Sequence, residues 1–230
     1  MKLNFNKYIE KLKELKENSL VNLLKEWNPK NELFLKVDEK GNYKDFKGDT
    51  IIFFLEEEEE DKKKVLNIQK KLYSKLGNYL APPLSEKYFH MTLHDLCNYN
   101  ITKEIENCIM NNKEKARKIL EEIKSSKKIK MKSLGLYNGG SAIGIMFSPT
   151  NEEELNLLLN TRKKFDTLIK QNDFYIPHVT LGYYLPIDYN DKIRRKIYNT
   201  LVQINADLEI AINFKNLEYV IFENMDMYKK

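Results

Sequence analysis

Phe89-His90-Met91-Thr92-Leu93 and Pro177-His178-Val179-Thr180-Leu181 are two copies of one short motif, histidine-x-threonine-leucine. Each copy closes a segment of the same design, in which a short apolar run is followed by a helical stretch and then by the motif. The apolar runs are 51–55 and 143–147, so the first histidine comes 39 residues after the start of its run and the second comes 35 residues after. The chain has only three histidines, and two of them occupy equivalent points of this duplication. The pattern predicts a pseudo-symmetric site in which two imidazoles face each other.

The motif has the alternation of a strand that lines a groove. Residues i and i+2 of a strand share a face, so His90 lies beside Thr92, His178 lies beside Thr180, and the apolar residues face the other way. A neutral imidazole can take a proton from a nucleophile while a protonated one donates to the departing oxygen. Threonine hydroxyls can donate hydrogen bonds to the oxygens of a phosphate. We therefore expect His90 and His178 to be catalytic and Thr92 and Thr180 to bind phosphate, in metal-independent phosphodiester chemistry.

The third histidine, His94, is a candidate for substrate contact. It lies two positions beyond Thr92 and therefore, on a regular strand, on the same face as His90. His90, His94 and His178 could together bind zinc, but an i, i+4 pair of metal ligands adjoins on a helix, and this segment is predicted to be a strand. We expect no metal and no cofactor. A purely structural role is the alternative for His94.

Two tyrosines are candidates for contact with a bound base or phosphate. Tyr137 precedes a turn at Asn138-Gly139-Gly140 and could stack on a base at the mouth of the groove. Tyr183 has odd spacing from His178, so it faces away on a regular strand and enters the groove only if a bulge redirects it. Packing in the core or on the surface is the alternative role for either side chain.

The rest of the chain alternates between helical and strand-like patterns. Helical spacing is predicted in 3–27, which Asn28-Pro29 ends, and Leu33–Val37 reads as a strand. Further helices are expected up to Gly77 and at 104–124, 150–170 and 190–202, and further strands at 129–137, 142–147, 208–214 and 217–222. We expect an α+β fold in which two pseudo-symmetric lobes with mainly antiparallel sheets surround a central groove. Residues 31–230 would form this bilobal domain, and residues 1–30 an N-terminal helical extension.

The composition is that of a folded protein with a mild preference for anionic partners. The 230 residues are 42% hydrophobic and 32% charged, and the net charge of +5 favours nucleotides or RNA, with a merely lysine-rich surface as the alternative. Cys97 and Cys108 make no disulfide framework, and no metal-ligand spacing surrounds them. The sequence shows neither a signal-peptide pattern nor an apolar run of membrane-spanning length. We expect a cytoplasmic protein without membrane contact, and the oligomeric state is left open.

The paired motifs, 88 residues apart, and the duplicated strand-helix-strand frame resemble the 2H phosphoesterase superfamily. Its members include bacterial RNA 2′-5′ ligase-like proteins, 2′,3′-cyclic phosphodiesterases and 2′,5′-oligoadenylate phosphodiesterases. Two further stretches, Lys36-Val37-Asp38-Glu39-Lys40-Gly41 and Phe46-Lys47-Gly48-Asp49-Thr50-Ile51-Ile52, are similar to a branch of predicted cyclic phosphodiesterases. The resemblance covers residues 33–223.

The resemblance implies a bilobal α+β fold with a central groove, an acid–base pair of His90 and His178, and no obligatory metal. Ligase-like members often carry a basic residue shortly after the second motif, where this chain has Gly182-Tyr183-Tyr184. The implied activity is hydrolysis of a cyclic or 2′-linked phosphodiester of a nucleotide or RNA end, with a 2′,3′-cyclic phosphate favoured. The alternatives are a phosphodiesterase of cyclic oligonucleotide or 2′-5′ oligoadenylate signals, and a non-catalytic module that binds RNA ends.

Overall fold

A computed structural model describes residues 4–55, 60–171 and 173–229, so residues 1–3 of the predicted N-terminal extension lie outside the described part. Its α-helices are α1 (Phe5–Val21), α2 (Leu33–Lys36), α3 (Glu60–Leu76), α4 (Ile105–Ile123), α5 (Glu152–Lys164) and α6 (Asp191–Gln203). Its strands are β1 (Gly48–Phe54), β2 (His90–Asn98), β3 (Lys128–Asn138), β4 (Ala142–Pro149), β5 (His178–Tyr183), β6 (Glu209–Asn213), β7 (Leu217–Asn224) and β8 (Met227–Lys229). Short 3₁₀ helices lie at 22–24, 77–79, 86–88, 165–167 and 214–216.

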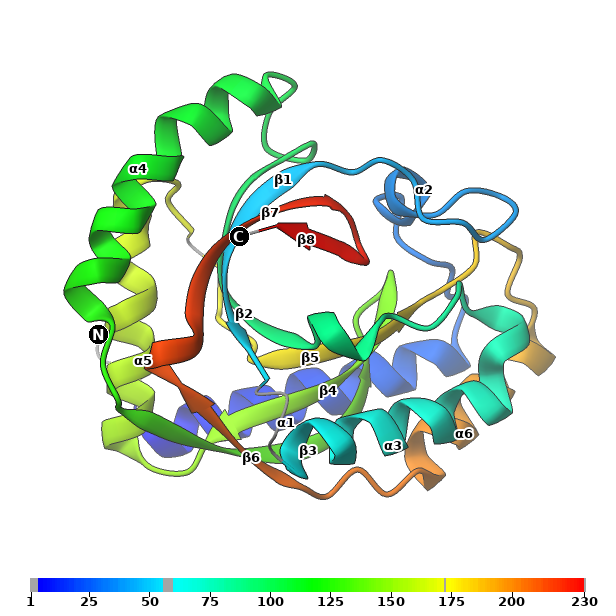
Figure 1. Ribbon diagram of the computed structural model, residues 1–230. Coiled ribbons are helices and arrows are strands. Elements are labelled where there is room, and N and C mark those ends of the chain that lie inside the picture. Colours follow the sequence, from blue (N-terminus) through cyan, green and yellow to red (C-terminus); the bar gives the residue numbers. More distant parts are fainter. Residues whose placement is uncertain (1–3, 56–59, 172, 230) are drawn as a thin grey trace.

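The described strands form one eight-stranded sheet with the order β6-β3-β4-β5-β2-β1-β7-β8, and each pairing between them is antiparallel. The two motif strands, β5 and β2, are neighbours at its centre. Each is flanked by the strand that precedes it in sequence by one helix, β4 beside β5 and β1 beside β2. The sheet curls, with α3, α4, α5 and α6 on its outer side (Figure 1). The predicted α+β class, with two related halves around a groove, is confirmed.

The apolar residues of the two motifs form the centre of the core. Met91, Leu93, Val179 and Leu181 are at most 1% exposed and belong to the main cluster of buried side chains. The helix α3 contributes to the same cluster through side chains spaced three or four residues apart, which is the pattern of a helix with one buried face. These buried residues are Val65, Ile68, Leu72 and Leu76. The apolar residues of each motif therefore face the core, and the polar residues of each motif face the opposite side of the sheet.

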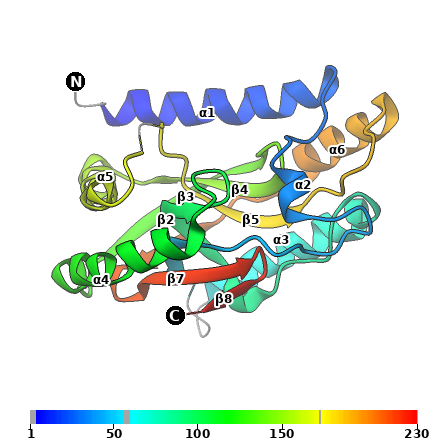
Figure 2. The same cartoon turned by 90° about the horizontal axis from the view of Figure 1, so that it is seen from above.

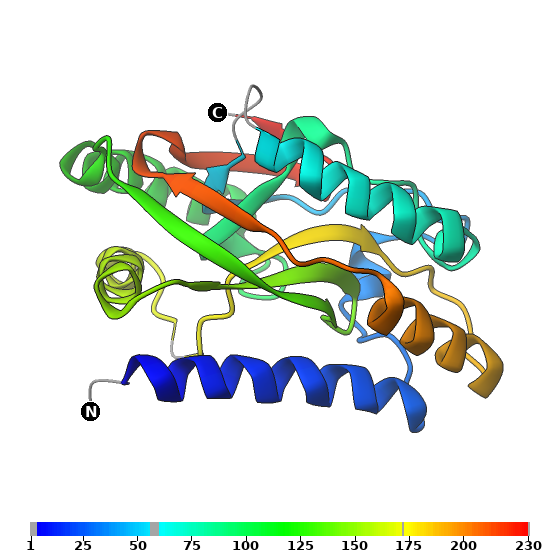
Figure 3. The ribbon, with the colours of Figure 1, turned by 90° about the horizontal axis from the view of Figure 1, so that it is seen from below.

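The N-terminal helix α1 packs against β3 and β4, on the side of the molecule away from β7 and β8 (Figures 2 and 3). Tyr8 and Leu12 of this helix are buried with Met146 of β4 in a small separate cluster. The Tyr8 hydroxyl donates a hydrogen bond to the Tyr175 carbonyl oxygen at 2.9 Å, just before β5. Within the described residues, no helix is both long enough and apolar enough to cross a membrane.

The predicted strand at Leu33–Val37 is wrong, because this segment forms the single helical turn α2. The Val37 amide donates to the Leu33 carbonyl oxygen at 2.9 Å, which is a helical i to i−4 hydrogen bond. Leu33 and Val37 are buried, whereas Phe34 and Leu35 are 49% and 43% exposed. Burial thus follows a spacing of four residues, and the apolar composition of the run suggested a strand although its buried positions have helical spacing. The turn places the Lys36 ammonium between the Phe46 ring, at 5.3 Å, and the Tyr183 ring of β5, at 5.7 Å.

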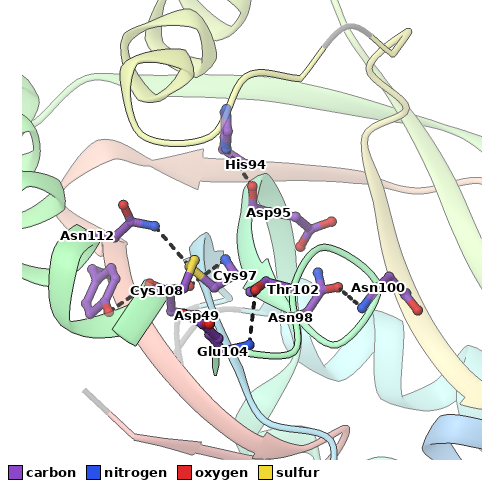
Figure 4. Close-up of a disulfide and its surroundings, with 11 residues drawn as sticks. Asp49, His94, Asp95, Cys97, Asn98, Asn100, Thr102, Glu104, Cys108 and Asn112 are labelled. Atoms are coloured by element: carbon purple, nitrogen blue, oxygen red, sulfur yellow. Dashed lines mark hydrogen bonds between the residues drawn. A yellow bond between two sulfur atoms is a disulfide. The ribbon is translucent and has the colours of Figure 1, made fainter. Parts of the chain in front are cut away.

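The sequence indicated no disulfide framework, but Cys97 and Cys108 form a disulfide (Figure 4). The bond joins the end of β2 to α4, with 6.0 Å between the two Cα atoms. The buried Asp49 accepts a hydrogen bond from the Cys97 amide at 2.6 Å, and Asn112 donates one to the Cys97 sulfur at 3.1 Å. The cysteine count does not reveal such a pair, since the packing of α4 against β2 is what brings the two sulfurs together.

Candidate active site

The two motif histidines lie diagonally across the junction of β2 and β5. The antiparallel pair at this junction is Met91 with Val179. On either side of that pair, the ladder sets His90 beside Thr180, and Thr92 beside His178. Diagonal neighbours on such a ladder are about 7–8 Å apart at Cα. All four polar side chains are half-buried, so two imidazoles and two hydroxyls share one small recessed area.

Each imidazole makes the same hydrogen bond to the backbone two residues earlier. The Nδ1 of His90 is 2.6 Å from the Tyr88 carbonyl oxygen, and the Nδ1 of His178 is 2.8 Å from the Ile176 carbonyl oxygen. A carbonyl oxygen can only accept, so Nδ1 must carry the proton in both rings. In the neutral ring, Nε2 then keeps its lone pair and is the atom available for proton transfer.

Both histidines are held toward the neutral form. Burial lowers the pKa of His90 to about 4, the nearby charge of His178 lowers it further, and the Tyr88 carbonyl acts in the opposite direction. Burial also lowers the pKa of His178, against the opposing effects of the Ile176 carbonyl and the charge of Asp95. The electrostatic effect of His178 on His90 means that the two rings share one environment. Perturbed pKa values of this kind are common at catalytic sites.

A β-bulge follows each motif at the same position. In the pairing of β1 with β2, Ile52 lies opposite Thr92 and Ile51 lies opposite His94. This leaves Leu93 of β2 as an extra residue between the two pairs. In β5 the extra residue is Leu181. The pairs on either side of it are Gly144 with Thr180 and Ile143 with Gly182. An extra residue reverses the alternation of a strand, so the side chains that follow it change face until the next irregularity, which in β2 lies between Asp95 and Asn98.

The bulges decide which later side chains reach the groove. Tyr183 is redirected to the groove face, as the sequence prediction required, and Asp95 occupies the equivalent position in β2. His94 does not line the groove: it is 1% exposed, and its Nε2 lies 3.2 Å from the Asp166 carboxylate. Its Nδ1 is 2.8 Å from the carbonyl oxygen of Asp95, whose side chain points elsewhere (Figure 4). The equivalent residue in β5 is Gly182.

A buried polar side chain from a helix holds each bulge in place. Arg162 of α5 donates from Nε to the Leu93 carbonyl oxygen at 3.1 Å. Gln69 of α3 donates from Nε2 to the Leu181 carbonyl oxygen at 2.9 Å. Each helix thus stabilises the motif strand of the other half. The helices satisfy carbonyl groups that the irregular ladder would leave without a partner, and an unsatisfied buried group costs about 1–3 kcal/mol.

The Thr92 segment of β2 is also fixed from behind. The hydroxyl of Tyr175 donates to the Thr92 carbonyl oxygen at 2.8 Å. The Arg162 guanidinium stacks over the Tyr175 ring at 5.1 Å and donates to the Asp173 carboxylate at 2.8 Å. Because Tyr8 hydrogen-bonds the backbone of Tyr175, α1 supports this part of the site although it lies outside the groove.

The polar face of the two motif strands forms the floor of a cavity of about 420 Å³. Each catalytic candidate has a tyrosine at its edge: the Tyr137 ring lies 5.6 Å from the His178 ring, and the Tyr228 ring lies 4.9 Å from the His90 ring. Charged side chains also line the cavity, namely Glu32, Lys36, Asp95, Arg162, Asp173 and Asp226. The volume is within the usual range of small-ligand sites.

Lys36, Asp95 and Tyr228 are among the cavity residues that sequence reasoning missed. The Lys36 ammonium lies 5.7 Å from the centre of the Tyr183 ring, so α2 brings a positive charge to the β5 side. No sequence signal places it there, since its position depends on how α2 docks. Asp95 could have been found, because it follows His90 at the distance at which Tyr183 follows His178.

The geometry does not bring the three histidines together. His94 lies on the core side of β2, whereas His90 lines the cavity. Among the described residues, no group of three or more histidine, cysteine, aspartate or glutamate side chains is arranged to bind a metal ion.

No known family model matches this chain, and no curated protein is detectably similar to it. Among solved structures it is similar to the conserved protein of unknown function ATU0111 from Agrobacterium tumefaciens strain C58, with a TM-score of 0.67 and 15% identity over 94% of this chain and 97% of that one. Weaker likenesses include TT0787 of Thermus thermophilus, with a TM-score of 0.49, 13% identity and 79% and 93% coverage. Escherichia coli LigT complexed with NADP+ has a TM-score of 0.40, 12% identity and 80% and 93% coverage.

The chain therefore shares the fold of ATU0111 over nearly its full length. This likeness supports the α+β architecture that was predicted from the paired motifs.

Proposed function

We propose that this protein is a metal-independent phosphodiesterase that hydrolyses a cyclic or 2′-linked phosphodiester of a nucleotide or RNA end, with a 2′,3′-cyclic phosphate as the favoured substrate. One observation carries the proposal. His90 and His178 lie on a diagonal of the central ladder, and each uses Nδ1 for a backbone carbonyl, so that two Nε2 atoms remain for acid–base chemistry.

In the proposed reaction, a neutral histidine takes a proton from water at Nε2 while the oxygen of that water bonds to phosphorus. The bond from phosphorus to one ribose oxygen breaks, and the other histidine, protonated at Nε2, donates its proton to that oxygen. Water is added, one phosphomonoester is formed, and the two rings exchange protonation states. Thr92 and Thr180 lie beside the histidines, where their hydroxyls can donate to the non-bridging oxygens as negative charge builds up.

The cavity supports a ligand of nucleotide size. Its volume of about 420 Å³ suits a mononucleotide or the last residue of an RNA chain. Tyr137 beside His178, and Tyr183 on the same side, offer aromatic faces for a base. We assign no substrate contact to His94, because it is buried against Asp166.

The test is a substrate panel assayed in excess chelator. The panel contains nucleoside 2′,3′-cyclic phosphates, RNA with a 2′,3′-cyclic end, cyclic dinucleotides and 2′-5′ oligoadenylate, and products are separated by chromatography. We expect hydrolysis of a 2′,3′-cyclic phosphate to a monoester without added metal. Turnover that the chelator abolishes would contradict the metal-independent mechanism, and binding across the panel without any product would favour the RNA-end binding module.

A further inference from the structure

The two sides of the cavity differ in charge at equivalent positions. The bulge in β5 presents Tyr183, with the Lys36 ammonium 5.7 Å from its ring, whereas the bulge in β2 presents the exposed Asp95. At these equivalent positions the β5 side therefore presents an aromatic ring beside a cation, and the β2 side presents a carboxylate. Each side also carries a charge of the other sign, Glu32 near β5 and Arg162 against β2. A bound phosphodiester therefore has different neighbours in each of its two possible orientations.

The Asp95 carboxylate has capacity to bind a ligand. Within the described part of the chain, Thr50 is the side chain seen to donate to it, from Oγ1 to Oδ1 at 3.3 Å. The other strong contacts of this residue use its backbone carbonyl oxygen, which accepts from Gln171 at 2.6 Å and faces His94 at 2.8 Å. An ionised carboxylate accepts hydrogen bonds at both oxygens and donates none, so it selects a partner with N–H or O–H groups.

The charge of Asp95 acts across the floor of the cavity. It raises the pKa of both His90 and His178, and it contributes to the raised pKa of Tyr183 on the opposite side. A second anion brought close to Asp95 would therefore meet direct repulsion.

We propose that Asp95 is a specificity-determining residue, which accepts hydrogen bonds from an uncharged, donor-bearing part of the substrate and excludes a second phosphate from the β2 side of the cavity. This inference rests on the proposed function and narrows its substrate class. The preferred ligand is a nucleoside cyclic phosphate whose far end carries a free 5′-hydroxyl.

Calorimetric titration with adenosine 2′-monophosphate and adenosine 2′,5′-bisphosphate tests the proposal without requiring turnover. The quantity measured is the ratio of the dissociation constant of the bisphosphate to that of the monophosphate. We expect a ratio of about five or more for the wild-type protein, since two unit charges at contact distance repel by about that factor even in water. In Asp95→Asn, which keeps the shape and removes the charge, the ratio should fall toward one.

The matched control is Glu32→Gln, which removes one negative charge from the β5 side of the same cavity. Glu32 accepts a hydrogen bond from the Ser141 hydroxyl at 2.8 Å, and an amide oxygen can replace it there. This variant should leave the ratio within about twofold of the wild-type value, because its charge is on the side that would not hold the second phosphate. Circular dichroism and thermal melting show whether both variants are folded.

The outcomes separate this inference from the proposed function. A wild-type ratio near one, an unchanged ratio in Asp95→Asn, or an equal fall in Glu32→Gln would each overturn the role of Asp95 while leaving the phosphodiesterase intact. If the wild-type protein binds neither nucleotide and hydrolyses no member of the substrate panel, the proposed function and the inference fail together.

Discussion

The surroundings of His90 in β2 and of His178 in β5 agree in three features. Each ring bonds through Nδ1 to the carbonyl two residues earlier, each has a tyrosine at its edge, and each is followed at the third position by a bulge. Five residues beyond the histidine the agreement ends, because one strand presents Asp95 and the other Tyr183.

The supports of the two motif strands differ as well. A charged Arg162 holds the bulge of β2, a neutral Gln69 holds that of β5, and only β2 among the two is fastened by a disulfide. The comparison indicates that the repeated features perform the reaction and the unrepeated ones select the ligand and stabilise each half. Four predictions test this division, from the largest expected effect to the smallest.

Replacing either motif histidine should have the largest effect. We expect His90→Ala and His178→Ala each to lower kcat/KM on a 2′,3′-cyclic nucleotide by roughly a thousandfold, since each ring performs one of two coupled proton transfers. The double variant should be little worse than either single one. His94→Phe is the control, because that ring does not line the cavity. Near-normal rates in either alanine variant, together with a native circular dichroism spectrum, would contradict the equivalent catalytic roles of the two histidines.

Loss of the disulfide should affect stability and leave the chemistry in place. The bond closes a loop with a sequence separation of 11, for which the chain-entropy model gives about 3 kcal/mol in the free energy of unfolding. We expect Cys108→Ala, or reduction of the wild-type protein, to lower the denaturant midpoint while kcat changes less than twofold. The variant lacking both cysteines should not respond to reductant. A loss of kcat as large as that of a histidine variant would contradict the separation of support from chemistry.

The two bulge-holding side chains should prove equivalent despite their different charges. Arg162→Met removes the donor to the Leu93 carbonyl and the contacts with Asp173 and Tyr175, and Gln69→Met removes the donor to the Leu181 and Leu84 carbonyls. Each should cost at least about 1–3 kcal/mol in urea unfolding and also lower kcat. The matched control is Arg195→Met on the exposed side of α6, where the ion pair with Asp191 should contribute less than about 1 kcal/mol. Stability loss in only one of the two would show that the halves are not supported alike.

The pH profile should distinguish the two rings. Burial and the charge of His178 lower the pKa of His90 to about 4, so His90 stays neutral above that pH and suits the role of base. The pKa of His178 is also below 6.5, so the protonated acid is lost as the pH rises through that lowered value. The kcat/KM of the wild-type protein should therefore form a bell with its maximum between about pH 4 and 6.5. A maximum above pH 7 would contradict this assignment.

The sequence predicts the central features because they depend on local periodicity and on the duplication. Alternation in the two motifs predicts that His90 and Thr92 share a face, and the repeat predicts that β2 and β5 meet. The sequence predictions fail where tertiary packing determines the local structure. Leu33–Val37 has strand-like composition and helical burial, and Cys97 meets Cys108 only because α4 packs on β2. The direction of His94 depends on a bulge that a single sequence does not reveal.

The paired bulges also have a consequence for how such a protein can change. Positions 95 and 183 face the cavity from strands whose neighbouring residues are fixed in the interior. Asp95 is exposed, and the contacts of Tyr183 are with residues at the edge of the cavity, Tyr43, Met225 and Lys36. Substitutions at these two positions, in evolution or in protein engineering, should change the ligand preference while the reaction centre between them stays the same. Libraries limited to these two sites should yield folded, active proteins with shifted preferences far more often than libraries spread over the whole cavity.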